Sequence, residues 1–152
     1  RHIVITDPKD NRLELAKKTA PGVVTVNTAD DLRAVAKSLG MNEGFDVGFE
    51  MSGAPAAMAT LTDHLVMGGK IAMLGLPARP FEYDFAKMVL KMITIKGIYG
   101  REMFETWHKM LAMLQSGLNI RPVITNRFLA AEFDTAFQSA IQGGAGKIVL
   151  EW

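Results

Sequence analysis

Two charged residues near the start of the chain are the side chains best suited to chemistry. Asp7 ends a short apolar run, and Arg12 lies on the first turns of the helical pattern that follows. In dinucleotide-binding folds, an acidic residue at the end of the second strand accepts hydrogen bonds from the adenosine ribose. Asp7 is equally well placed to cap the next helix, and Arg12 alone is typical of a solvent-exposed arginine. Both alternatives stay open at this point.

Three further stretches follow the ends of predicted strands and have a glycine within a residue or two. They are Ser52-Gly53, Leu74-Gly75-Leu76 and Ile98-Tyr99. In an open parallel sheet, ligands bind outside the carboxyl ends of the strands, and glycine lets the backbone approach a flat ligand closely. Each stretch alone is explained by turn geometry. Together with Asp7 they favour a bound nucleotide.

Other motifs are weaker. Gly143–Lys147 resembles a phosphate-binding loop but lacks the first glycine and the Ser/Thr after the lysine, and it leads into a strand. We interpret it as a helix stop followed by a turn. His2, His64 and His108 are scattered and do not pair with a carboxylate at a metal-ligand spacing. The sequence therefore predicts no catalytic residue and no metal ligand of its own.

Composition limits the classes of function. The chain has 152 residues, about one domain, of which 49% are hydrophobic and 22% charged. A formal net charge of +1 gives no general attraction to nucleic acid or to an anionic membrane. The absence of cysteine excludes disulfides and thiolate metal sites within these residues, and apolar runs are too short to span a membrane. Without a signal-peptide pattern at residues 1–7, we expect a soluble, cytoplasmic protein.

Short apolar runs alternate with segments of helical period along the whole chain. Strands are expected at residues 2–6, 23–26, 45–51, 70–74, 93–98, 121–128 and 147–152. The helix after the fifth of these is marked by apolar residues at Met103, Trp107, Met110, Leu111 and Leu114. Such alternation is typical of βαβ units, so the sequence predicts an α/β fold with a parallel sheet.

Helix boundaries are predicted from capping residues. We expect Pro8 at the first position of the first helix, and Thr28 as the cap of the second, with Asp31 as its capping-box partner. Gly40 should close that second helix. Gly68-Gly69 is expected to end the third helix, and Asp84 to cap a helix of about two turns.

Five blocks of the sequence carry a resemblance to a known family. They are His2–Asp7, Arg12–Ala16, Glu43–Ala54, Gly69–Pro77 and Lys96–Trp107. These blocks resemble the threonine dehydrogenases of the zinc-dependent medium-chain dehydrogenase/reductase superfamily, over nearly the whole chain. The last block, with Gly-Arg-Glu-Met-Phe-Glu-Thr-Trp, is more specific than the superfamily's nucleotide-site pattern. It favours threonine dehydrogenases over sorbitol or alcohol dehydrogenases.

The resemblance implies NAD as the cofactor. By that resemblance, Asp7 and Arg12 would hold the adenosine ribose, and a carboxylate at Asp7 would disfavour the 2′-phosphate of NADP. The remaining cofactor contacts would be Leu74, Gly75, Leu76, Ile98 and Tyr99, the last two at the nicotinamide end. Arg101 is a weaker candidate for holding a substrate carboxylate, because a cation there opposes the helix dipole.

The resemblance also implies what the chain lacks. We expect residues 1–120 to form an incomplete doubly wound (Rossmann) NAD domain without its first strand, and residues 121–152 to return to the catalytic domain. That missing strand would separate residues 2–6 from 45–51 in the order 3-2-1-4-5-6, leaving two unpaired edges. The ligands of the catalytic zinc would lie in the missing part. The chain alone should therefore be inactive, whereas the intact enzyme would oxidise L-threonine to 2-amino-3-oxobutanoate.

The resemblance also has implications for how subunits assemble. The family implies a homo-oligomer, a tetramer, paired through the strand Ile93–Ile98. Two alternatives stay open: another medium-chain polyol or alcohol dehydrogenase, and an S-adenosylmethionine-dependent methyltransferase-like domain. A methyltransferase sheet would finish with an antiparallel strand inserted between its last two parallel strands. The helix that follows residues 93–98, which would be the sixth strand of the complete sheet, favours a dehydrogenase instead.

Overall fold

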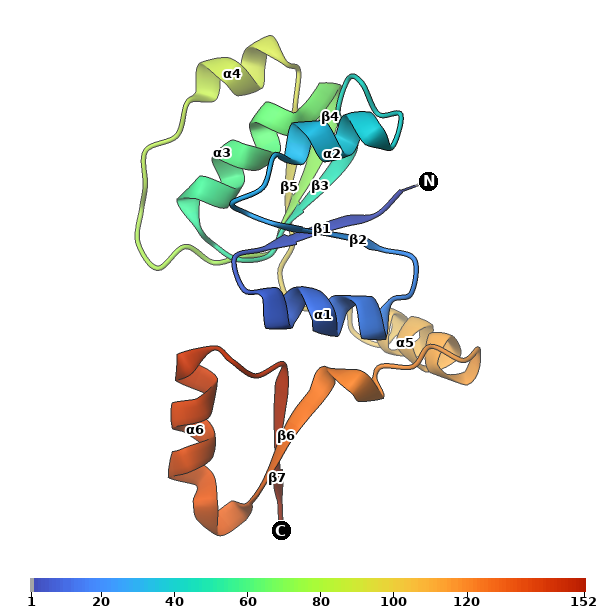
Figure 1. Cartoon of the computed structure of the whole chain (residues 1–152), viewed down its shortest axis with the longest axis vertical. Helices are drawn as coiled ribbons and strands as arrows, with labels where there is room; N and C mark the ends of the chain where they lie inside the picture. Colours follow the sequence, from blue (N-terminus) through green and yellow to red (C-terminus); the bar gives the residue numbers. More distant parts are fainter. Residues whose placement is uncertain (1) are drawn as a thin grey trace. The chain divides into compact units, whose positions relative to one another are not determined.

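A computed structural model describes residues 2–152 and shows strands and helices in alternation (Figure 1). In chain order the elements are β1 Val4–Asp7, α1 Asp10–Thr19, β2 Val24–Asn27, α2 Leu32–Ser38, β3 Phe45–Glu50, α3 Pro55–His64, β4 Leu65–Met73, α4 Phe85–Leu90, β5 Thr94–Gly97, α5 Glu105–Gln115, η1 Arg121–Val123, β6 Ile124–Leu129, η2 Ala130–Glu132, α6 Phe133–Gln142 and β7 Lys147–Glu151. The predicted α/β class is confirmed. No helix within residues 2–152 is long and apolar enough to cross a membrane.

The strands form three parallel sheets. β1 pairs with β2, the order β3-β4-β5 makes a second sheet, and β6 pairs with β7. In the doubly wound order 3-2-1-4-5-6, β1 and β2 match strands two and three, and β3 to β5 match strands four to six. Among the strands of residues 2–152, β1 and β3 are each paired on one side only, in agreement with the strand order expected from the sequence. All strand pairings given for residues 2–152 are parallel, which argues against the methyltransferase-like alternative.

The chain divides into two compact units. One consists of residues 1–30 and 103–152, and the other of residues 31–102. The boundary expected at residue 120 lies inside the first unit and remains a prediction. β5 is an edge strand of the second unit, paired only with β4. Its expected role in subunit pairing likewise remains a prediction.

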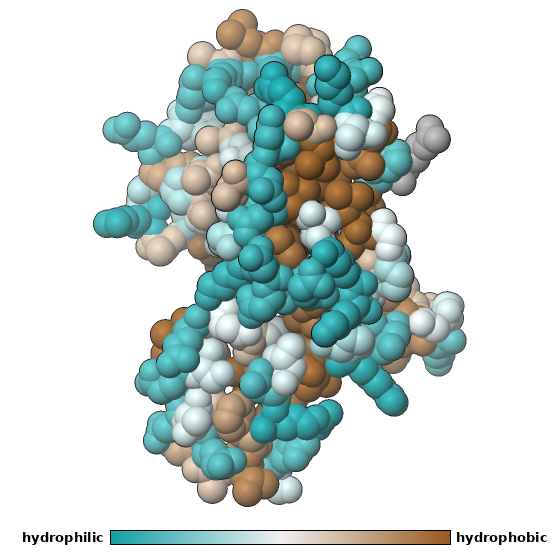
Figure 2. All heavy atoms as spheres, viewed as in Figure 1, coloured by the Kyte–Doolittle hydropathy of each residue, from teal (hydrophilic) through white to brown (hydrophobic). Residues whose placement is uncertain are grey.

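The second unit has a core on one face of its sheet. Met58 of α3 packs there with Leu65, Ile71 and Ile93, all less than 10% exposed. The opposite face is open: Val47, Phe49 and Met51 alternate with buried residues along and just beyond β3, and each is at least 47% exposed. Figure 2 shows hydrophobic atoms gathered in the part of the view that the three-stranded sheet fills in Figure 1. Parallel sheets are normally covered on both faces, so this face is unusual.

Three predicted boundaries are wrong. Pro8 precedes the first helix, because Asp7 draws the chain into a turn and α1 begins only after Lys9. Thr28 does not cap α2; Asp31 does, accepting the N–H groups of residues 33 and 34. Gly68-Gly69 does not end α3, which ends at His64. The two glycines lie inside β4, where the register with β3 is irregular.

Other capping predictions are confirmed. Gly40 follows α2 with a positive φ of 78°, the left-handed conformation that favours glycine. Asp84 caps α4 by accepting the N–H groups of Ala86 and Lys87. Gly143 ends α6 in the left-handed region, as expected for a helix stop and turn.

Lys91 closes the C-terminal end of α3. Its Nζ donates to the carbonyl oxygens of Thr62, Asp63 and Leu65 at 2.8–2.9 Å. A cation at a helix C-terminus is favourable both as a donor to free carbonyls and against the helix dipole.

We therefore expect Lys91→Met to lower the free energy of unfolding by about 1–2 kcal/mol, measured by urea denaturation. Lys96→Met, on the exposed strand β5, is the matched control and should change stability by less than about 0.5 kcal/mol. Equal losses in the two variants would contradict the capping role.

The ion pair between Asp63 and Lys87 should make stability depend on acid pH. The hydrogen bond from Lys87, 2.7 Å long, lowers the pKa of Asp63 below its ordinary value of 3.8. A group with a lowered folded pKa stabilises the protein above its unfolded pKa, and this gain disappears as pH falls through the folded pKa. The stability difference between wild type and Lys87→Met should therefore shrink on acidification from about pH 6 to about pH 2. A difference that stays constant over this range would refute the assignment.

Candidate functional site

Asp7 lies at the end of β1 with one carboxylate oxygen engaged in a turn. Its Oδ1 accepts the backbone N–H of Lys9 at 2.8 Å, and its Oδ2 lies 3.6 Å from Nη1 of Arg12. The N-cap of α1 is Lys9, so the alternative that Asp7 caps this helix is wrong. A carboxylate accepts about four hydrogen bonds, and the Asp7 side chain is 23% exposed. It therefore retains acceptor capacity for hydroxyl groups.

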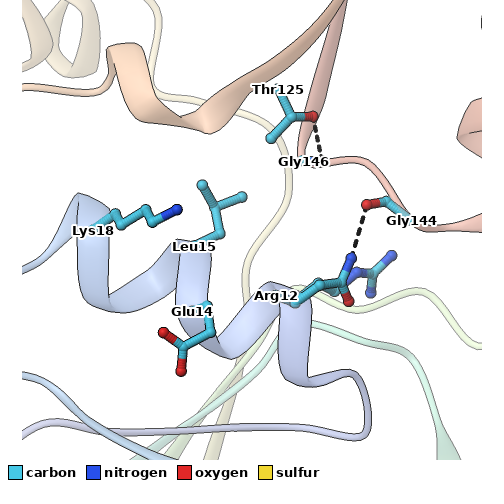
Figure 3. A pocket seen from close by; sticks show the side chains of 8 residues that line it. Arg12, Glu14, Leu15, Lys18, Thr125, Gly144 and Gly146 are labelled. Atoms are coloured by element: carbon cyan, nitrogen blue, oxygen red, sulfur yellow. Dashed lines mark hydrogen bonds between the residues drawn. The ribbon is translucent and has the colours of Figure 1, made fainter.

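Arg12 is more constrained than a freely solvated surface arginine. Besides Asp7, it approaches the turn between α6 and β7: a Cβ added to Gly143 would lie 3.2 Å from its Nη2. Arg12 also lines a cavity of about 200 Å³ between α1 and that turn (Figure 3). Arg12 and Asp7 thus form one polar cluster in the first unit.

The other predicted positions meet where the carboxyl ends of β3, β4 and β5 lie together, which is called the sheet edge below. The N–H groups of Leu74 and Gly75 both donate to the carbonyl of Glu50 at 2.8 and 3.0 Å, and that of Ile98 donates to Met73 at 2.9 Å. These bonds join the carboxyl ends of β3, β4 and β5. Leu76 and Tyr99 are highly exposed there, at 82% and 95%. The sheet edge therefore has apolar and aromatic side chains on its surface.

The glycines at this edge allow two turns of the chain to approach each other closely. A Cβ on Gly75 would collide with the backbone of Gly53 and with the Glu50 carboxylate, and one on Gly53 would collide with the backbone of Leu76. Gly53 also has a positive φ of 70°. At these two positions the close approach is between two turns, and it determines where Leu76 emerges.

Glu50 is the residue that sequence reasoning missed. It is 2% exposed, and its carboxylate accepts the Ser52 N–H at 2.9 Å, the Ser52 hydroxyl at 2.5 Å and the Gly53 N–H at 3.0 Å. The only local signal was an acidic residue ending an apolar run before Ser-Gly. Glu50 positions the strand ends and does not face a ligand.

The residues of each unit, taken separately, have chemistry that suits one end of NAD. The Asp7 carboxylate accepts hydrogen bonds, as ribose hydroxyls require, and Leu76, Ile98 and Tyr99 offer apolar surface suited to a flat ring. Within residues 2–152, no group of three or more His, Asp or Glu side chains could hold a metal ion. Asp7 and Arg12 belong to the first unit, and the sheet-edge residues belong to the second.

Gly75→Ala should lower the free energy of unfolding by about 1–3 kcal/mol, because a methyl group would force the two turns apart. Gly97→Ala is the matched control: it lies on the neighbouring strand with open space around it, and its effect should stay within about 0.5 kcal/mol. Denaturation curves of both variants test this. Similar stability of the two would refute the close packing at Gly75.

The chain is similar to a known protein family and to curated relatives. The family model described as "Zinc-binding dehydrogenase" matches residues 2–116. The chain is 52% identical to the L-threonine 3-dehydrogenases of Ruegeria pomeroyi and Salmonella typhi, over 100% of its own length and 45% of theirs. It therefore spans about half the length of these curated relatives.

A solved structure confirms the fold. The crystal structure of L-idonate 5-dehydrogenase from Escherichia coli superposes with a TM-score of 0.85 at 23% identity, over 99% of this chain and 43% of that one. The family match and the strand order agree with the resemblance found in the sequence. The chain belongs to the zinc-binding dehydrogenase family.

Proposed function

We propose that this chain is the cofactor-binding part of an NAD-dependent L-threonine 3-dehydrogenase. The observation that carries the proposal is the 52% identity to L-threonine 3-dehydrogenases along the entire chain. The α/β architecture with polar and apolar residues at the carboxyl ends of its strands supports it. The complete enzyme would oxidise L-threonine to 2-amino-3-oxobutanoate.

Asp7 and Arg12 bind the adenosine end in this proposal. The ribose hydroxyls donate to the Asp7 carboxylate, and Arg12, 3.6 Å from Oδ2, faces the same carboxylate. A 2′-phosphate would bring a second anion against Asp7, and its repulsion favours NAD over NADP.

The sheet edge binds the other end. Leu74, Gly75 and Leu76 contact the cofactor after β4, and Ile98 and Tyr99 line the nicotinamide side after β5. NAD, when bound, accepts the hydride that leaves the alcohol carbon of the substrate. Leu76, Ile98 and Tyr99 would contact the nicotinamide ring and orient it, and we assign no step to a metal in this chain.

Three further expectations belong to the same proposal. Zinc would be held by residues of the complete enzyme outside this chain. The complete enzyme would be a homotetramer paired through the edge strand β5, and it would act in the cytoplasm. Its partner is a small-molecule substrate.

The test uses the complete enzyme that contains this chain. It should form NADH in the presence of L-threonine, and Asp7→Asn should raise the KM for NAD by about tenfold or more, because charge-assisted hydrogen bonds to the ribose are weakened. The preference for NAD over NADP should fall in the same variant. Glu14→Gln removes an exposed carboxylate from α1 and is the matched control. Absence of threonine-dependent NADH formation would overturn the proposed activity, and an unchanged KM would overturn the role of Asp7.

A further inference from the structure

Lys9 joins two segments that are far apart in the sequence. Its backbone N–H donates to the Asp7 carboxylate at 2.8 Å, and its Nζ donates to the carbonyls of Gln142 and Gly143 at 2.9 and 3.0 Å. These carbonyls lie at the C-terminal end of α6, where the helix dipole favours a cation. One residue therefore connects the proposed ribose carboxylate to the α6–β7 turn.

The turn is shaped to receive these side chains. Gly143 has a φ of +67°, and a Cβ placed on it would lie 2.8 Å from Nζ of Lys9 and 3.2 Å from Nη2 of Arg12. A side chain here would require the Lys9 ammonium to move and would press on the Arg12 guanidinium, although both are ends of flexible side chains. The positive φ is therefore the main reason for glycine at this position.

A second polar contact joins α1 to the same turn, because Asn11 donates from Nδ2 to the carbonyl of Gly144 at 2.9 Å. The turn is itself tied to β6, since the Gly146 N–H donates to the hydroxyl of Thr125 at 2.9 Å (Figure 3). A Cβ on Gly146 would lie 2.6 Å from Cδ2 of Leu15. The first turns of α1 are therefore docked on the 143–146 turn through polar and apolar contacts together.

The position of Arg12 shows what this docking achieves. Its Nη1 lies 3.6 Å from Oδ2 of Asp7, longer than a charge-assisted hydrogen bond of about 2.7–2.9 Å. Its Nη2 lies beside Gly143, 3.2 Å from where a Cβ would stand, so the guanidinium spans the space between the carboxylate and the turn. An arginine released from the turn would pair with Asp7 and compete with the ribose hydroxyls.

We propose that Lys9 is a positioning residue that holds the α6–β7 turn beside Arg12 and thereby keeps the Asp7 carboxylate open to the adenosine ribose. This rests on the proposed NAD function and extends it to a residue that does not touch the cofactor. The 143–146 turn becomes part of the adenosine site, although it lies more than 130 residues from Asp7 in the sequence.

Calorimetry on the complete enzyme tests the proposal with two probes. ADP-ribose carries the adenosine ribose, whereas nicotinamide mononucleotide does not. Lys9→Met should weaken ADP-ribose binding about threefold to tenfold, as expected for coupled residues in one network, and leave nicotinamide mononucleotide binding unchanged. The KM for NAD should rise while kcat stays constant. Lys9→Arg, which can still donate to both carbonyls, should restore binding.

Two further variants keep the result interpretable. Lys17→Met removes a lysine of the same helix that pairs only locally with Glu14, and it should bind ADP-ribose like wild type. Lys9→Gln also removes the charge but keeps a polar end group, and it serves if Lys9→Met does not fold. Equal loss of both probes would indicate a general loss of structure and would overturn the positioning role.

Asp7→Asn, measured in parallel, separates the two proposals. If Asp7→Asn weakens ADP-ribose binding and Lys9→Met and Lys9→Gln do not, the positioning role is overturned and the proposed function stands. If Asp7→Asn has no effect either, the ribose-binding role of Asp7 and the positioning role of Lys9 both fail, whereas the proposed activity is judged by threonine-dependent NADH formation. Loss of ADP-ribose binding in Asp7→Asn and in the Lys9 variants, with rescue by Lys9→Arg, supports both.

Discussion

The buried carboxylate of Glu50 is the interaction on which the sheet edge of the second unit depends. A carboxylate removed from water is costly unless its oxygens are hydrogen-bonded, and here Ser52 and Gly53 supply three donors. The backbone carbonyl of the same residue accepts the N–H groups of Leu74 and Gly75. One residue thus joins the ends of β3 and β4, so the residues that follow both strands emerge together.

Two strand edges and one face of β3 are not covered by other described segments of the chain. β1 and β3 each have an edge without a strand partner, and Val47 and Phe49 are exposed on one face of β3. Unpaired edges and uncovered parallel sheets are unfavourable in water, so we expect other protein segments to pack there. The relatives, of which this chain covers 45%, have additional residues that could do so. This agrees with the proposal that the chain is the cofactor-binding part of a larger enzyme.

The proposed adenosine end depends on contacts between segments that are far apart in the sequence. Asp7 has the chemistry to bind a ribose, but its usefulness depends on how closely Arg12 approaches it. In the proposal, Lys9 influences that approach through its contacts with the α6–β7 turn. A residue that does not touch the cofactor would then change the affinity of one that does.

The sequence by itself determined the α/β class and much of the local structure. Alternating apolar and helical patterns, the Asp84 cap and the stop at Gly143 depend on residues within about four positions of one another, and such local signals are readable from a single chain. It also indicated Asp7 and the strand ends as candidates. The tertiary structure alone decided that Gly68-Gly69 lies inside a strand, that Glu50 is buried and that Lys9 reaches Gly143. These features arise from pairing and packing between distant residues, which neither periodicity nor capping rules encode.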